Sequence, residues 1–197
     1  MMMRRGVVLV GGSGAGKSTI LRALRDHFSW APEIAFPRRF VTRMPRADDV
    51  SEENVSVTEQ ELDDLERIGH ILLRWRKELS ADAAAHYAFE RLHATFAVLG
   101  GNDALLADGA KIRPSPQALD GYLRVLVSAP VEVRYERLSR RSPELNRHSD
   151  EWRVRMTDNE PALRLKVDMV VANSGGDPLI NAAELVQAIE CHVTRLG

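Results

Sequence analysis

A glycine-rich segment near the start of the chain constrains the fold more than any other feature. Residues 11–18 read Gly-Gly-Ser-Gly-Ala-Gly-Lys-Ser and match the pattern G-x-x-x-x-G-K-[ST] at every fixed position. A valine-rich apolar run, residues 6–10, precedes the segment, and the apolar side chains of residues 17–27 after it share one helical face. The sequence therefore predicts a strand, a glycine loop and a helix in succession.

This succession is typical of a loop that binds the phosphates of a nucleotide. Backbone N–H groups can wrap a phosphate chain where glycine removes the obstructing Cβ atom, and the N-terminus of the next helix favours anions. We expect Lys17 to neutralise charge between the β- and γ-phosphates, the Ser18 hydroxyl to bind Mg²⁺, and Thr19 to reach the α-phosphate. A glycine turn that binds nothing is the alternative, which the flanking strand and helix disfavour. The predicted nucleotide-binding set is Gly11, Gly12, Ser13, Gly14, Ala15, Gly16, Lys17, Ser18 and Thr19.

Strand and helix signals alternate along the rest of the chain. Thr58 followed by Glu61 forms a capping-box pattern, which predicts a helix that Gly69 ends. Alternation of strands and helices predicts an α/β fold with a mostly parallel sheet that helices flank on both faces. The other expected strands are residues 39–42, 54–57, 71–75, 95–99, 122–127 and 167–172.

The remaining helices are expected from periodicity and composition. Residues 81–92 are alanine-rich and are expected to be helical, and residues 149–155 begin another helix. Pro130 opens a helix with Val131, Tyr135 and Leu138 on one face. Residues 178–195 are expected to form one amphipathic helix. Its apolar side holds Ile180, Ala183, Val186, Ile189 and Val193.

The composition narrows the classes of partner. The chain has 197 residues, enough for one domain, and its formal net charge of −1 gives no overall attraction to nucleic acid or a membrane surface. The single cysteine, Cys191, cannot form an internal disulfide, which favours a reducing, cytoplasmic setting. No apolar run approaches the roughly 18 residues of a membrane span. We therefore expect neither a nucleic-acid nor a membrane partner, and the sequence leaves a homodimer open.

Arginines are concentrated between residues 134 and 155. In a phosphoryl-transfer enzyme, arginines on a mobile lid stabilise the charge of the moving group and exclude water. A solvated basic helix face is the ordinary alternative, and nucleic-acid binding is a third, although Trp152 is the only aromatic residue between Arg137 and Arg155 apart from histidine. We favour the lid and expect Arg141 and Arg155 to act in catalysis. The seven arginines are Arg134, Arg137, Arg140, Arg141, Arg147, Arg153 and Arg155.

A second arginine pair follows the strand expected at residues 39–42. Arg43 and Arg46 stand three residues apart in a predicted loop. Two such side chains can clamp a phosphate through bidentate hydrogen bonds. The pair is a candidate site for a phosphorylated acceptor, and an ordinary exposed loop is the alternative.

With these motifs in view, the chain resembles the guanylate kinase-like branch of the nucleoside monophosphate kinases. Within that branch it is most similar to the ribose 1,5-bisphosphate phosphokinases. The stretch Ser-Glu-Glu-Asn-Val-Ser-Val-Thr-Glu-Gln-Glu-Leu, which leads into the expected capped helix, carries this preference. The other similar segments are residues 11–19, 39–43, 137–141, 155–156 and 167–173.

The resemblance implies ATP and Mg²⁺, and transfer of the γ-phosphoryl group to the 1-phosphate of ribose 1,5-bisphosphate to give phosphoribosyl pyrophosphate. It also implies that Asn173 lies beside the adenine and that Tyr87 lies near the acceptor. The implied layout is a single P-loop kinase domain with three parts. These are a core of residues 1–36, 93–136 and 160–197, an acceptor-binding subdomain of about 37–92, and a lid of about 137–159.

The chain departs from the family pattern near the acceptor. The family closes a segment that begins with Trp on a Tyr-Gly pair, whereas here a longer stretch separates Trp75 from Tyr87, and Ala88 replaces the glycine. Another phosphorylated acceptor, such as GMP or a different sugar phosphate, therefore stays open, as does a non-catalytic nucleotide-binding domain. Asp103 follows an expected strand and is a candidate to reach the metal through water, with a loop or helix-cap aspartate as the alternative.

Overall fold

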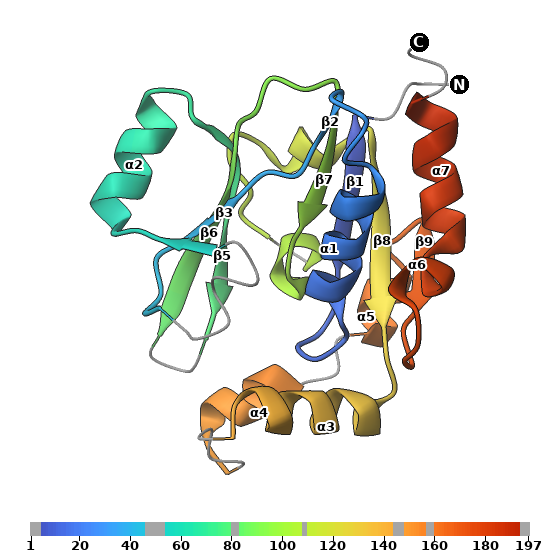
Figure 1. Ribbon diagram of the computed structural model, residues 1–197. Coiled ribbons are helices and arrows are strands. Elements are labelled where there is room, and N and C mark those ends of the chain that lie inside the picture. The colour runs from blue at the N-terminus through green and yellow to red at the C-terminus, as the bar shows by residue number, and fades with distance from the viewer. Residues whose placement is uncertain are drawn as a thin grey trace.

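Two β-sheets lie side by side in the computed structural model (Figure 1), which describes residues 5–45, 54–79, 83–107, 110–143, 148–156 and 160–193. The larger sheet has five parallel strands in the order β2-β7-β1-β8-β9. Strand β1, which leads into the glycine loop, lies at its centre. The strands are β1 (Gly6–Val10), β2 (Ile34–Ala35), β7 (Phe96–Gly100), β8 (Tyr122–Ser128) and β9 (Met169–Ala172).

Both faces of the five-stranded sheet are covered, as the apolar strands predict. Val7 and Leu9 of β1 face a cluster that includes Ile20 and Leu24 of α1 (Lys17–His27). Helix α7 (Ala183–Val193) covers the same face. Val8 and Val10 point the other way, toward α5 (Glu160–Arg164), the 3₁₀ turn η1 (Asp103–Leu106) and the second sheet. Because β1 is buried on both faces, its sequence is apolar at every position after Gly6.

The second sheet has four strands and lies beside the first. Its order is β4-β3-β6-β5, and β3 pairs parallel with β4 and antiparallel with β6. Helix α2 (Glu59–Arg67) covers its outer face, where Leu62 contacts Phe40 and Ala88. The strands are β3 (Arg39–Val41), β4 (Asn54–Ser56), β5 (Ile71–Glu78) and β6 (Ala84–Glu90).

The helix expected over residues 81–92 is wrong, because residues 84–90 form strand β6. Ala85, Tyr87 and Phe89 face the cluster between the two sheets, while Ala88 faces α2. The backbone of β6 also pairs with β3 on one side and β5 on the other. This two-sided burial and pairing outweighs the high helix propensity of alanine.

Helix α2 begins and ends as predicted. The backbone N–H of Glu61 donates to the Thr58 hydroxyl oxygen over 3.1 Å, and the backbone N–H of Thr58 donates to the Glu61 carboxylate over 2.7 Å. This reciprocal pair is the capping box. After the helix, Gly69 takes a left-handed backbone conformation with φ of 80°, which glycine adopts without strain.

Two predictions for helices in the second half of the chain differ from the structure. Helix α3 (Val131–Arg141) buries Arg134 and Leu138, whereas Val131 and Tyr135 of the expected apolar face are exposed. The single helix expected over residues 178–195 is divided into α6 (Pro178–Asn181) and α7, with Ile180 exposed and Ala182, Leu185 and Ile189 buried. Helix α4 (Asp150–Met156) lies with α3 below the five-stranded sheet (Figure 1), and η2 (Pro116–Leu119) precedes β8. No helix in the described ranges has the length and apolar character needed to cross a membrane.

Candidate phosphate-transfer site

A cleft of about 430 Å³ lies where the two sheets and helix α3 meet. The glycine loop after β1, here called the P-loop (residues 11–18), forms one end of it. Arg39, Arg43 and Tyr87 of the four-stranded sheet and its flanks line another part, and Arg141 and Arg155 reach it from α3 and α4. The structure thus brings the predicted loop, lid and acceptor residues to one cavity.

The P-loop takes its shape from its glycines and from Lys17. Gly14 and Gly16 have φ of 79° and 91°, which residues with a Cβ rarely adopt. The Lys17 ammonium group donates to the carbonyl oxygens of Gly11 and Gly12 over 2.7 and 3.2 Å, so it lies across the loop. Ser18 and Thr19 line the cleft with Lys17, at the start of α1. Gly12 and Ala15 belong to the loop but not to the described lining of the cleft.

Two arginines of α3 donate to backbone carbonyls of the P-loop. Arg134 is 3% exposed, and its Nε donates to the Ser13 carbonyl over 3.1 Å. Arg137 donates from Nη1 to the carbonyls of Gly14, Ala15 and Asn173 over 3.3, 3.5 and 3.2 Å. Sequence reasoning assigned neither of these roles. The spacing of Arg134, Arg137 and Arg141 along one helical face was the signal that could have suggested them.

Asn173 lies behind the P-loop, outside the described lining of the cleft. It is buried, and its side-chain amide donates to the Ala15 carbonyl over 2.8 Å. Asn181 of α6 in turn donates to the Asn173 side-chain oxygen over 3.2 Å. The described contacts of Asn173 therefore support the loop that was expected to bind the nucleotide.

The residues predicted to contact the acceptor lie on and next to β3 and β6. Arg39 donates to the Gly100 carbonyl over 2.6 Å and to the Asn54 side chain over 2.7 Å, and its guanidinium lies 5.8 Å from the centre of the Tyr87 ring. Arg43 lines the cleft, and its Nη1 donates to the Met44 carbonyl over 3.0 Å. Arg46, the other predicted clamp residue, lies outside the described residues.

The long stretch between Trp75 and Tyr87 forms the end of a β-hairpin. Trp75 and Tyr87 are direct partners across β5 and β6, and their rings stack with centroids 5.6 Å apart. Residues 76–78 extend β5 and residues 84–86 extend β6, and the two rings remain stacked across the pair of strands. Ala88, where the family pattern has glycine, contributes to the buried cluster against α2, and Tyr87 before it lines the cleft.

Polar contacts join the four-stranded sheet to the end of β7. The Trp75 indole N–H donates to the Asn102 side-chain oxygen over 3.0 Å. Lys77, which lines the cleft, forms an ion pair with Asp103, the first residue of η1. Asp103 is therefore paired with a lysine in the first position of a 3₁₀ turn whose cap residue is Asn102, and its water-mediated contact with a metal stays a prediction.

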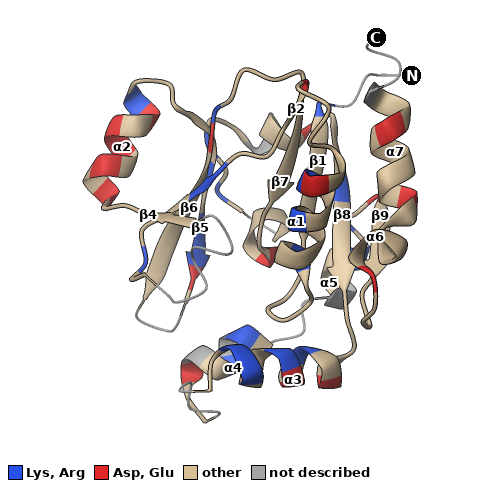
Figure 2. Ribbon diagram, in the orientation of Figure 1, with Lys and Arg blue, Asp and Glu red and all other residues tan. Residues whose placement is uncertain are grey.

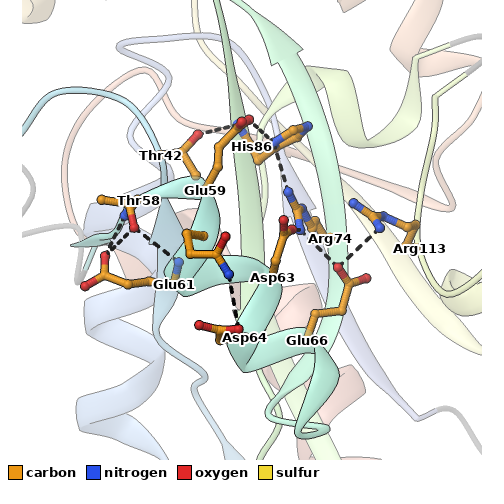
Figure 3. A network of polar contacts seen from close by, with 11 residues as sticks. Thr42, Thr58, Glu59, Glu61, Asp63, Asp64, Glu66, Arg74, His86 and Arg113 are labelled. Carbon is orange, nitrogen blue, oxygen red and sulfur yellow. Dashed lines mark hydrogen bonds and ion pairs between the residues drawn. The ribbon is translucent and has the colours of Figure 1, made fainter.

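A polar network fastens α2 to the sheet that carries the acceptor residues (Figure 3). Arg74 is 3% exposed and donates to Asp63 and Glu66 over 2.5 and 3.0 Å. The His86 Nδ1 lies 3.0 Å from Arg74 Nη2 and 2.8 Å from a Glu59 carboxylate oxygen. Burial lowers the pKa of His86, the charge of Arg74 lowers it further, and Glu59 opposes the shift.

The same network reaches the cleft through the backbone. Thr42 donates its backbone N–H to the His86 carbonyl over 3.0 Å, and the His86 backbone N–H donates to the Thr42 hydroxyl oxygen over 2.9 Å. Arg43 follows Thr42 and Tyr87 follows His86, and both line the cleft. The position of α2 is thus coupled to two candidate acceptor contacts.

The charge of the cleft is of one sign. Figure 2 shows lysines and arginines gathered on α3 and α4, with acidic residues gathered on α2. No aspartate or glutamate occurs among the described residues that line the cleft. Such a surface is suited to polyanionic ligands. Its basic residues are Lys17, Arg22, Arg25, Arg39, Arg43, Lys77, Arg137, Arg141 and Arg155.

Comparison with known proteins shows relatives over nearly the whole chain. No family model matches it. A "Ribose 1,5-bisphosphate phosphokinase PhnN" of Rhodopseudomonas palustris is 31% identical over 184 residues, which is 93% of this chain and 87% of that protein. A protein of the same name from Methylobacterium radiotolerans is 43% identical over 70 residues, 36% of this chain and 38% of that protein.

Solved structures show the same fold. A guanylate kinase from Anaplasma phagocytophilum, 15% identical, matches with a TM-score of 0.55 over 97% of this chain and 88% of that one. A shikimate kinase from Acinetobacter baumannii, 16% identical, matches with a TM-score of 0.50 over 95% and 94%. The predicted α/β P-loop fold is therefore confirmed. Because a relative is 31% identical over 93% of this chain, the chain belongs to the PhnN family of ribose 1,5-bisphosphate phosphokinases and is a P-loop kinase.

Proposed function

We propose that the protein transfers the γ-phosphoryl group of ATP to the 1-phosphate of ribose 1,5-bisphosphate, giving phosphoribosyl pyrophosphate and ADP. One observation carries this proposal: a P-loop and a separate set of arginines share a cleft whose described lining contains no carboxylate. The printed name of the relative at 31% identity supports the choice of acceptor. A donor and an acceptor that both carry phosphates match the charge of this cleft.

The proposed reaction needs no covalent intermediate on the protein. An oxygen of the acceptor phosphate attacks the γ-phosphorus in line, and the bond from that phosphorus to the β-phosphate oxygen breaks as ADP leaves. Lys17, Arg141 and Arg155 neutralise the charge that builds on the transferred group and on the leaving phosphate. Arg43, Arg46 and Tyr87 hold the acceptor. The protein contributes positioning and charge rather than a nucleophile.

The P-loop also fits a bound Mg²⁺. In P-loop proteins the Ser or Thr hydroxyl that follows the lysine binds Mg²⁺, and the ion usually keeps several waters. The Ser18 hydroxyl lines the cleft beside Lys17 and would hold the ion there. The chemistry supplied there would be Lewis-acid neutralisation of phosphate charge.

We further propose that the parts of the fold divide this work. The four-stranded sheet with α2 would bind the acceptor, residues 137–159 would act as the lid, and the five-stranded sheet with its helices would bind the nucleotide. This division is supported by where the candidate residues lie, because Arg43 and Tyr87 belong to the first part and Arg141 and Arg155 to the second.

A transfer assay tests the proposal. The protein is incubated with Mg·ATP and a panel of acceptors that includes ribose 1,5-bisphosphate, ribose 5-phosphate and GMP, and products are identified by phosphorus NMR. We expect a diphosphate resonance from ribose 1,5-bisphosphate. We also expect a Lys17→Ala variant to keep its melting temperature and to have a kcat lower by roughly two to three orders of magnitude. Transfer to GMP and to no other acceptor of the panel would show that the proposed acceptor is wrong. Binding of ATP without transfer to any acceptor would indicate a non-catalytic domain.

A further inference from the structure

One face of helix α1 continues from the P-loop along the wall of the cleft. Ser18, Leu21, Arg22 and Arg25 follow the i, i+3, i+4, i+7 spacing of a single helical stripe, and all four line the cleft. The opposite face, with Ile20 and Leu24, is buried against the sheet. The stripe therefore carries two arginines into the cleft at fixed distances from the P-loop.

These two arginines lie beyond the reach of the loop itself. At about 1.5 Å of rise per residue, the backbone of Arg22 lies roughly 7.5 Å along the helix from Lys17, and that of Arg25 roughly 12 Å. The P-loop wraps one end of the cleft, so Arg22 and Arg25 serve a part of it that lies farther along α1.

An aromatic ring sets the position of Arg25. Its guanidinium carbon lies 5.2 Å from the centre of the Phe36 ring, in the connection between β2 and β3, and Phe36 also lines the cleft. A planar guanidinium that rests on a ring keeps its fork of N–H donors in one orientation, which suits bidentate binding of phosphate.

The charges around Arg25 favour an anion. Burial lowers the pKa of the Arg25 guanidinium, Asp26 raises it, and the neighbouring charge of Arg22 lowers it. Asp26 is exposed and does not belong to the described lining of the cleft. Like charges brought together in a cleft are costly, and a bound dianion relieves that cost.

We propose that Arg22 and Arg25, with Arg25 held on Phe36, form a subsite for a second phosphate of the acceptor, the one that receives no phosphoryl group. This inference rests on the proposed function and narrows it to acceptors that carry two phosphates. Arg43 remains at the reacting end, and helix α1 fixes how far along its axis Arg22 and Arg25 stand from the P-loop. The subsite selects the bisphosphate over a monophosphate that presents the same reacting group.

The test compares two acceptors in the wild-type protein and in Arg22→Gln, Arg25→Gln and Arg25→Lys variants. Ribose 1,5-bisphosphate carries both phosphates, and ribose 1-phosphate carries only the reacting one. For the bisphosphate, we expect each Gln variant to raise KM at least tenfold, while kcat and the KM for ATP change less than threefold. For the monophosphate, wild type should have a low kcat/KM, and the Gln variants should have the same kcat/KM as wild type. Arg25→Lys should recover part of the loss.

The control is Arg67→Gln, an exposed arginine of α2 that pairs with Asp64 outside the cleft. Melting temperatures establish that every variant is folded. Suppose that wild type phosphorylates the bisphosphate. The subsite alone is then wrong if the Gln variants lose kcat/KM equally for both acceptors, or if their KM for the bisphosphate equals that of wild type. If wild type binds Mg·ATP but phosphorylates neither sugar, the proposed function and the subsite are both wrong.

Discussion

Arg134 is one of the two residues through which helix α3 contacts the P-loop backbone. Its guanidinium is buried and donates to the carbonyls of Ser13 over 3.1 Å and of Arg155 over 3.4 Å. In a trans peptide the C=O and the following N–H point in opposite directions. Holding the Ser13 carbonyl toward α3 therefore turns the Gly14 N–H away from α3, and Gly14 lines the cleft. One buried charge thus sets the direction of a donor in the P-loop and contacts helix α4, part of the proposed lid.

Replacing Arg134 with lysine tests this role. Lysine keeps the charge, but a single ammonium group cannot reproduce the planar fork that reaches both carbonyls. We expect Arg134→Lys to weaken Mg·ATP binding about tenfold, because the loss of orienting hydrogen bonds is of that order. Calorimetry measures the affinity.

The matched control is Arg140→Lys on the same helix. Arg140 is exposed, pairs with Glu136 and does not belong to the described lining of the cleft. The control should bind Mg·ATP as wild type does. A lower melting temperature in Arg134→Lys with unchanged ATP affinity would show that Arg134 only packs the helix.

At the scale of elements, motifs that are contiguous in the sequence correctly predicted the helices and strands next to them. The succession of β1, P-loop and α1 follows from a contiguous motif, and α2 follows from a capping box and a closing glycine. Strand β6 did not follow, because its alternation becomes visible only when β3 and β5 lie on either side of it. The buried face of α3 was missed because it contains Arg134, which a search for apolar periodicity passes over.

The candidate site also has one part that is continuous in the sequence and another that the fold brings together. Its P-loop end is continuous in sequence and was predicted as a unit. The proposed acceptor side joins residues from α1, β3 and β5, so Arg22, Arg25, Arg39 and Lys77 came together only through the fold. Their shared location depends on how the hairpin packs beside the end of β7, which no local spacing encodes.

The contacts of His86 predict how pH affects the packing of α2. A neutral Nδ1 accepts from Arg74, whereas a protonated Nδ1 donates to Glu59 and is repelled by Arg74. The folded-state pKa of His86 is lowered, chiefly by burial, so it lies below the ordinary value of 6.5. The unfolded chain therefore binds a proton more readily than the folded one. The contribution of His86 to stability is present above pH 6.5 and is lost as pH falls through the lowered pKa.

Urea denaturation between pH 7.5 and pH 5 measures this contribution. The free energy of unfolding of wild type should fall more steeply with decreasing pH than that of His86→Gln, because glutamine does not titrate. His93→Gln, at an exposed position, should follow the wild-type curve. Identical pH dependence in wild type and His86→Gln would refute the effect of burial on this imidazole.

The whole molecule combines a nearly neutral chain with a strongly basic cleft. The formal net charge is −1, while nine of the described residues lining the cleft are lysine or arginine and none is acidic. The attraction for phosphorylated ligands is therefore local. Helices α1, α3 and α4 and the four-stranded sheet with its flanks together create this field, because none of them supplies all nine side chains.

Such a field makes acceptor binding sensitive to salt. The Debye length shortens from about 10 Å at 0.1 M to about 3 Å at 1 M salt, so added ions screen the arginines that lie away from the reacting groups. Raising KCl from 0.1 to 0.5 M should increase the KM for ribose 1,5-bisphosphate by roughly tenfold, while kcat changes less, because the groups in the closed site are screened less. Sucrose at the same osmolality should leave KM unchanged. If KM were insensitive to KCl while kcat fell, the cleft would not recognise its acceptor mainly by charge, and the basic lining would have to act on the chemical step alone.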